Sequence, residues 1–192
     1  MQGRKALLGY GRSRQGQDAP VDAIDTGLTA EEFDSWTREN GWSVPPHIRW
    51  GFVSVLNLPE VSAAAEGKVR VWPASTARTG MQLQALHGGR IELRDGCFFT
   101  GAAGQPADKL AWFHAEIGLD IDTEGYYVLR DRVDGATLAR LGEEMNWAGP
   151  ASATMDDDRK RALLEACGPA EIMVVGSPQS RVRFQAQYPH AR

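Results

Sequence analysis

Short segments in which apolar and polar residues alternate recur through residues 67–152. They are spaced about 8–12 residues apart and separated by turn residues, as in all-β barrels and sandwiches. Ile91 and Leu93 alternate with charged residues, and the Asp95-Gly96 pair that follows is a strong hairpin signal. The pattern therefore predicts an α+β protein whose core is a mainly antiparallel β barrel or sandwich.

A helix is expected on each side of this core. Thr29 and Glu32 have the spacing of a capping box, and Gly41 is placed to end a helix, so we predict a helix over 30–40. Three consecutive aspartates precede the segment 159–167 and suit the positive N-terminus of a helix. The fold class thus includes an N-terminal and a C-terminal helix.

The C-terminal helix is followed by two predicted strands. An apolar strand at 172–176 and an alternating strand at 181–185 are expected to pair as a β-hairpin. The chain is then expected to form one globular unit with four parts: a flexible arm (1–27), a helical and extended segment (28–66), the β-rich core (67–152) and an α–β piece packed on it (153–192).

Composition restricts the class of partner. Hydrophobic residues make up 42% and charged residues 24% of the chain, the balance of an ordinary soluble globular protein. The formal net charge of −4 argues against a domain that binds nucleic acid through bulk positive charge. No apolar stretch reaches the roughly 18–20 residues of a membrane span. The expected partner is an unknown protein or a small molecule.

Cys97 and Cys167 are the two cysteines of the chain. An even count permits one disulfide, which requires an oxidising compartment, and two buried free thiols are the alternative. Arg4-Lys5 followed by the apolar residues 6–8 has the beginning of a secretion signal, but such a signal needs an apolar run of about 7–15 residues. We therefore expect either a cytoplasmic protein or a trimmed form of an exported one.

The segment 120–131 has the spacing of a calcium-binding loop. Its candidate ligands are Asp120, Asp122, Glu124, Tyr126 (through its backbone carbonyl) and Asp131. Gly125 stands where such a loop turns sharply. The alternative is an ordinary β-turn in which Gly125 supplies a positive φ. We therefore expect no cofactor, with calcium as the alternative.

His114 and Glu116 share one face if their segment is a strand, and a third ligand would complete a zinc site. With the carboxylates of 120–124 they would define a hydrolytic or metal-dependent enzyme. The alternative is a hydrogen-bonded or exposed histidine. The sequence contains no nucleophile elbow, dinucleotide-binding motif or phosphate loop.

The chain has six tryptophans. Trp42, Arg49 and Trp50 lie close to the Pro45-Pro46 pair and form a candidate binding surface, because tryptophan and arginine are favoured at such surfaces. The alternative is that the tryptophans belong to the core, where each buries a large apolar area.

The segment 89–98, in which a glycine and an alternating strand lead into a glycine–cysteine pair, resembles a signature of uncharacterised bacterial small β-domain proteins. Many of these are secreted or lipid-anchored. The cysteine, glycine and proline at 167–169, before an apolar strand, are similar to their tails. The resemblance covers about 68–176. It implies a compact β-domain, an exported setting and a Cys97–Cys167 bond, and it implies no activity and no catalytic residue.

These observations favour a non-catalytic, β-rich accessory or binding domain, because a strong β pattern stands beside no assembled catalytic set. A periplasmic or other extracytoplasmic location is preferred to a cytoplasmic one. The alternatives are the enzyme built on His114 and Glu116 and a calcium-stabilised module.

Overall fold

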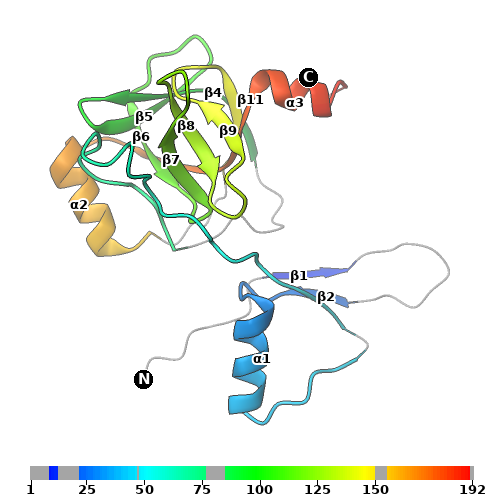
Figure 1. The fold of residues 1–192 in the computed structure, drawn as a ribbon. Helices are drawn as coiled ribbons and strands as arrows, with labels where there is room; N and C mark the ends of the chain where they lie inside the picture. The colour runs from blue at the N-terminus through cyan, green and yellow to red at the C-terminus, as the bar shows by residue number, and fades with distance from the viewer. Residues whose placement is uncertain (1–8, 13–21, 47, 77–84, 150–154, 191–192) are drawn as a thin grey trace. The chain divides into compact units, whose positions relative to one another are not determined.

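The computed structural model describes residues 9–12, 22–46, 48–76, 85–149 and 155–190 (Figure 1). The chain separates into two compact units. The first comprises Met1–Val55 and Gly80–Gln82, and the second comprises Leu56–Thr79 and Leu83–Arg192.

The first unit combines a three-stranded sheet with one helix. β1 (Gly9–Arg12) pairs antiparallel with β2 (Asp22–Asp25), which pairs in parallel with β3 (Arg49–Gly51). Both β1 and β2 fall within the predicted arm over 1–27, and they pair through backbone hydrogen bonds although they lack an apolar pattern. The other residues of that arm up to residue 21 lie outside the described ranges.

The predicted first helix is confirmed as α1 (Ala30–Glu39). The Thr29 hydroxyl accepts a hydrogen bond from the backbone N–H of Glu32, and the Glu32 carboxylate accepts one from the backbone N–H of Thr29. This capping box satisfies two N–H groups that have no partner inside the helix. Its geometry explains why the helix begins where the sequence predicts.

The second unit is built on a closed five-stranded barrel (Figure 1). Its strands are β4 (Ala85–Arg94), β5 (Cys97–Ala102), β6 (Lys109–Phe113), β10 (Met145–Gly149) and β11 (Ile172–Ser180). Their order around the barrel is β4-β5-β6-β11-β10, and each pairing is antiparallel except β6–β11, which is parallel. The predicted α+β class with a mainly antiparallel barrel is confirmed.

The turn between β4 and β5 is the predicted Asp95-Gly96 hairpin. Both residues have positive φ, +50° for Asp95 and +77° for Gly96. Two consecutive positive φ values match the right-handed twist of the flanking strands, and Asp-Gly tolerates them well. This turn sets the register in which Arg94 pairs with Cys97.

A second sheet is inserted between β6 and β10. It consists of β7 (Ile117–Ile121), β8 (Tyr127–Asp131) and β9 (Thr137–Arg140), in that order and antiparallel. Leu119 and Leu129 of this sheet belong to the same buried cluster as Phe98, Phe113 and Trp147 of the barrel. The barrel and the second sheet therefore share one apolar core.

α2 (Asp157–Cys167) lies in the connection from β10 to β11. Its Leu163 packs against Leu110 and Trp112 of β6, and all three side chains are buried. These two β6 residues alternate with Ala111 and Phe113 of the main core, so they face outward from the barrel. α2 therefore covers the outer face of β6.

The end of α2 is held to the start of β5. Cys167 forms a disulfide with Cys97, with an S–S distance of 2.00 Å. The backbone N–H of Arg70 donates to the Gly96 carbonyl, and its guanidinium donates to the Ala166 carbonyl, both at 2.9 Å. Of the two alternatives for the cysteines, the structure contains the disulfide.

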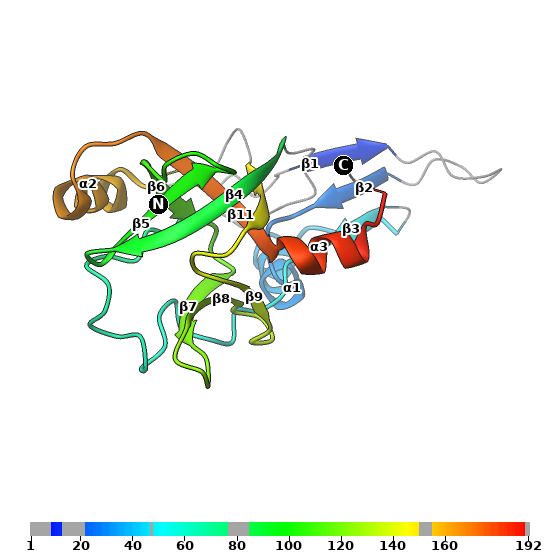
Figure 2. The ribbon, with the colours of Figure 1, turned by 90° about the horizontal axis from the view of Figure 1, so that it is seen from above.

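The prediction of a C-terminal hairpin is wrong in its second strand. β11 ends at Ser180, and α3 (Arg181–Gln187) follows directly. The alternation of Val182 and Phe184 with arginine is typical of a strand, but arginine, glutamine and alanine are strong helix formers. α3 contacts β10 and β11 (Figure 2).

Candidate functional site

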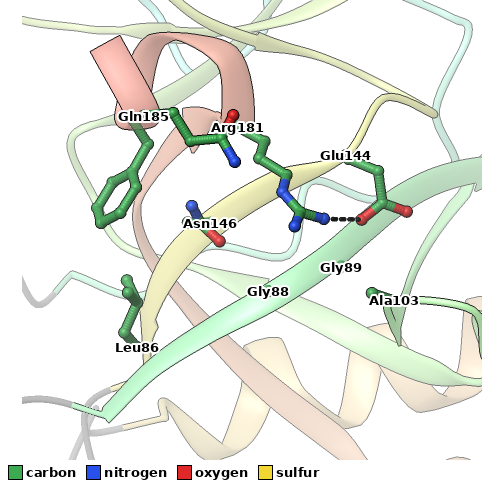
Figure 3. Close-up of a pocket in the computed structure, with 9 residues that line it drawn as sticks. Leu86, Gly88, Gly89, Ala103, Glu144, Asn146, Arg181 and Gln185 are labelled. Carbon is green, nitrogen blue, oxygen red and sulfur yellow. Dashed lines mark ion pairs between the residues drawn. The ribbon is translucent and has the colours of Figure 1, made fainter. Parts of the chain in front are cut away.

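An open pocket of about 270 Å³ lies over β4 and β10 of the barrel, with α3 along its rim (Figure 3). This volume is close to the lower limit of small-molecule sites, roughly 300 Å³. The pocket combines backbone, polar and apolar surface, and its lining residues are Leu86, Gly88, Gly89, Ala103, Glu144, Asn146, Arg181, Phe184 and Gln185.

The floor of the pocket is the glycine pair of β4. A Cβ on Gly89 would lie 2.0 Å from the Gly101 carbonyl oxygen of β5, so only glycine permits this approach of the two backbones. A Cβ on Gly88 would meet only the Asn146 side-chain oxygen, at 3.1 Å. Gly88 is exposed, so its lack of a side chain leaves the backbone open to a ligand.

Two opposite charges meet at the wall of the pocket. The Arg181 guanidinium lies 3.8 Å from Oε2 of Glu144 (Figure 3), which exceeds hydrogen-bond distance. Oε2 is buried and accepts no hydrogen bond within the described part of the chain. The backbones of the two residues do form a hydrogen bond, in which the Arg181 N–H donates to the Glu144 carbonyl at 3.0 Å. The ion pair is therefore incomplete, and both groups keep unused hydrogen-bonding capacity.

Two amides and two apolar side chains complete the lining. Asn146 and Gln185 can each donate and accept hydrogen bonds. Leu86 is 59% exposed, and the Phe184 ring lies 5.0 Å from that of Tyr188. A ligand here would meet polar groups on one side and apolar surface on another.

The predicted calcium loop holds a guanidinium instead. Arg140 lies 2.9 Å from Asp122 and 2.9 Å from Glu124, with its guanidinium over the Tyr126 ring. Burial raises the pKa of Asp122, but hydrogen bonds from the backbone N–H groups of Tyr126 and Glu124 and the charge of Arg140 outweigh it and lower that pKa. The segment forms the alternative, a β-turn with Gly125 at φ +87°.

The other two candidate carboxylates, Asp120 and Asp131, are also engaged. Asp120 pairs with Arg130 at 2.9 Å, and Asp131 accepts a hydrogen bond from the backbone N–H of Val133. Across the described ranges, no three His, Cys, Asp or Glu side chains are grouped so that they could hold a metal ion. The spacing of these residues suggests a calcium loop. It does not show that pairing of the strands in the second sheet brings Arg130 and Arg140 to the carboxylates.

Asp120 should make the second unit sensitive to acid. Burial raises its pKa, but hydrogen bonds from Ser62 and from the backbone of Ile121, together with Arg130, outweigh it and lower the pKa. The unfolded chain then binds a proton at higher pH than the folded one, so the stabilisation is complete above about pH 4–5 and is lost as pH falls through the folded pKa. We expect Asp120→Asn to destabilise at pH 7 and the deficit to shrink at pH 3, measured by urea unfolding.

Glu66→Gln, at an exposed position, is the control for this experiment. A deficit in Asp120→Asn that stays constant from pH 7 to pH 3 would contradict the assignment.

His114 and Glu116 lie in the turn between β6 and β7 and not in a strand, with 3.9 Å between Nδ1 and Oε1. His114 is buried, and Glu116 lines a smaller cavity of about 160 Å³ with Asp131, Ser177 and Arg183. The third metal ligand that the enzyme hypothesis requires is not grouped with them among the described residues. Of the two predictions for His114, its burial favours a structural role.

The candidate surface at Trp42, Arg49 and Trp50 belongs to the first unit. The Trp42 and Trp50 rings are 5.5 Å apart and T-shaped, and Phe33 contacts both. Phe33 is buried, whereas Trp42 is 39% exposed. The cluster thus serves as the core of this unit and also shows part of its aromatic surface to solvent.

Sequence reasoning missed the pocket over β4 and β10. The Gly88-Gly89 pair in mid-strand was the available signal, since glycine in a strand often marks a close approach of backbone or ligand. No local sequence pattern marks Glu144 or Arg181 as part of a site. They are far apart in the sequence, and the closure of the barrel and the start of α3 after β11 bring them together.

Comparison with known proteins found no matching family model, no matching curated protein and no matching solved structure. The fold is therefore described by its own topology. Numbered in chain order, the five barrel strands follow the order 1-2-3-5-4 around the barrel, with strands 3 and 5 parallel. Within the described ranges, none of the helices has the length and apolar content that a bilayer crossing requires.

The outer face of β5 and β6 is covered in this chain. Phe99, Leu110 and Trp112 form this outer face, and they pack with Leu163 of α2. The pocket over β4 and β10 lies on other strands and remains open.

Proposed function

We propose that this protein is a non-catalytic binding module whose ligand site is the pocket over β4, β10 and α3. The incomplete Glu144–Arg181 pair is the observation that carries the proposal. Oε2 of Glu144 is itself buried, but the side chains of Glu144 and Arg181 are 41% and 52% exposed, so a ligand can form hydrogen bonds with their exposed atoms at this wall. The adjacent amides and the open glycine floor supply further contacts of the kind found in small-molecule sites.

The enzyme alternative has less support. Its carboxylates Asp122 and Glu124 are paired with Arg140, and Asp120 is paired with Arg130. The pKa values of Asp120 and Asp122 are lowered, in part by these arginines, which makes both carboxylates poor general bases.

We infer an extracytoplasmic location, because a structural disulfide such as Cys97–Cys167 persists in an oxidising compartment. The resemblance to small bacterial β-domain proteins, many of them exported, supports the same inference.

Thermal unfolding with a panel of small polar compounds tests the proposed function. We use sugars, amino acids and nucleosides, each at high millimolar concentration. A compound that binds the folded state raises the Tm, by about 2–4 °C for a stabilisation of roughly 1 kcal/mol. We expect at least one compound class to raise the Tm of the wild type and to have no such effect on Gly88→Val, whose side chain fills the pocket floor.

Asn146→Ala serves as a second variant if Gly88→Val folds poorly. A Tm that responds to no compound, or responds equally in the wild type and both variants, would refute the pocket as a ligand site.

A further inference from the structure

The aromatic cluster of the first unit reaches the surface. Trp36, Trp42 and Phe52 are 41%, 39% and 45% exposed, and each ring lies within 6.0 Å of another ring of the cluster. A contiguous exposed apolar patch of this kind marks an interaction surface. We propose that this aromatic surface (Trp36, Trp42 and Phe52) binds an arginine-bearing basic segment of a partner protein.

Carboxylates border the aromatic surface. Glu32 is four residues before Trp36 and Glu39 is three residues after it, so both lie beside its ring on the same side of α1. Each carboxylate accepts a hydrogen bond from a hydroxyl group of the same segment, and these neutral partners leave its negative charge in place. The surface therefore presents exposed rings next to negative charge, and this combination attracts a cation.

The two arginines nearest in the sequence point elsewhere. Arg38 is two residues from Trp36, so it lies on another side of α1. Arg49 precedes Trp50 in β3, and successive residues of a strand face opposite sides of the sheet. Trp50 faces the cluster, because its ring lies 5.0 Å from that of Phe33, so Arg49 points away from it.

The chain itself shows which cation fits such a combination. Arg140 lies over the Tyr126 ring, 4.6 Å from its centroid, and pairs with two carboxylates. Arg94 lies over the Phe99 ring at 4.2 Å and also pairs with a carboxylate. A planar guanidinium can stack on a ring while it donates to carboxylates, whereas the ammonium of lysine is compact and more strongly hydrated. The aromatic surface offers the same two elements to solvent.

Other occupants fit this surface less well. A purely apolar partner would bury the carboxylates of Glu32 and Glu39 without a compensating charge, which is costly. A nucleic acid or an acidic segment would be repelled by them. A second copy in a twofold contact would place the same patch on both sides and bring two acidic helices together.

Fluorescence anisotropy with labelled peptides and the full chain tests the proposal. The probes are short glycine–serine peptides that carry several arginines, the same number of lysines, or the same number of aspartates. We expect the arginine peptide to bind, the lysine peptide to bind more weakly, and the aspartate peptide not to bind.

Two pairs of variants separate the rings from the charge. Trp36→Leu should weaken binding of the arginine peptide about threefold to fivefold, because it removes a ring but keeps apolar surface. Tyr188→Leu, at a 48% exposed ring of the second unit, is its control and should leave the Kd unchanged. Glu39→Gln should weaken binding about twofold to threefold at low salt, whereas Glu66→Gln, which removes an exposed carboxylate elsewhere, should not.

Four results would overturn the proposal. The arginine peptide fails to bind, or the aspartate peptide binds as tightly. The Kd is the same in the wild type and Trp36→Leu. Glu39→Gln and Glu66→Gln weaken binding equally, which would show attraction by net charge alone. The chain self-associates and Trp36→Leu abolishes this, which would assign the surface to a second copy. The pocket of the second unit takes no part in these measurements, so their failure leaves the proposed function standing.

Discussion

Gly89→Ala is expected to lower the free energy of unfolding of the second unit by about 3 kcal/mol or more. A Cβ at this position would lie 2.0 Å from the Gly101 carbonyl oxygen and 3.0 Å from Cα of Ala102. Both are backbone atoms of β5, and Gly89 pairs with Ala102 in the barrel register. Relief of the overlap requires β4 and β5 to separate, which breaks ladder hydrogen bonds beside the pocket.

Gly88→Ala is the matched control for this substitution. Its nearest neighbour would be the Asn146 side-chain oxygen at 3.1 Å, which can move by a few tenths of an ångström. We expect a change within about 1 kcal/mol, measured by urea unfolding followed through tryptophan fluorescence. Equal stability of the two variants would contradict the close backbone contact on which the pocket floor depends.

Loss of the disulfide is the second large effect. Cys97 and Cys167 are 70 residues apart in the chain, and the chain-entropy model gives an upper value of about 4 kcal/mol for a loop of this length. The bond also holds the end of α2 against the barrel, where Leu163 packs on Leu110 and Trp112. We expect reduction, or the double variant Cys97→Ala/Cys167→Ala, to lower the free energy of unfolding by a few kcal/mol.

Urea unfolding with and without dithiothreitol measures this effect. The double variant provides the control, because reductant should leave its midpoint unchanged. A wild-type midpoint that does not move on full reduction would show that α2 is held by packing and hydrogen bonds alone.

The local parts of the fold could be predicted from the sequence. The capping box of α1, the Asp95-Gly96 turn and the aspartate cap of α2 depend on residues within a few positions of each other. Short-range hydrogen bonds and allowed φ values determine such features, so a single sequence shows them.

The long-range parts could not be predicted. The barrel closes through the parallel pairing of β6 with β11, in which Trp112 lies opposite Val174. No local pattern specifies that partner. In the same way, Arg140 reaches Asp122 and Glu124 only because β8 and β9 pair, and the spacing of the loop residues does not show this contact. The walls of the pocket likewise depend on long-range contacts between β4, β10 and α3, and only its Gly88-Gly89 floor is a local feature of the sequence.

Amide chemical-shift mapping tests the central claim most directly. The full chain, labelled with ¹⁵N, is titrated with the compound that raises the Tm of the wild type most. The account predicts shifts concentrated in β4, β10 and α3, including Gly88, Asn146 and Arg181. Shifts concentrated on the outer face of β5 and β6, around Phe99 and Leu110, would contradict it, as would a spectrum that does not change at a saturating concentration of the compound.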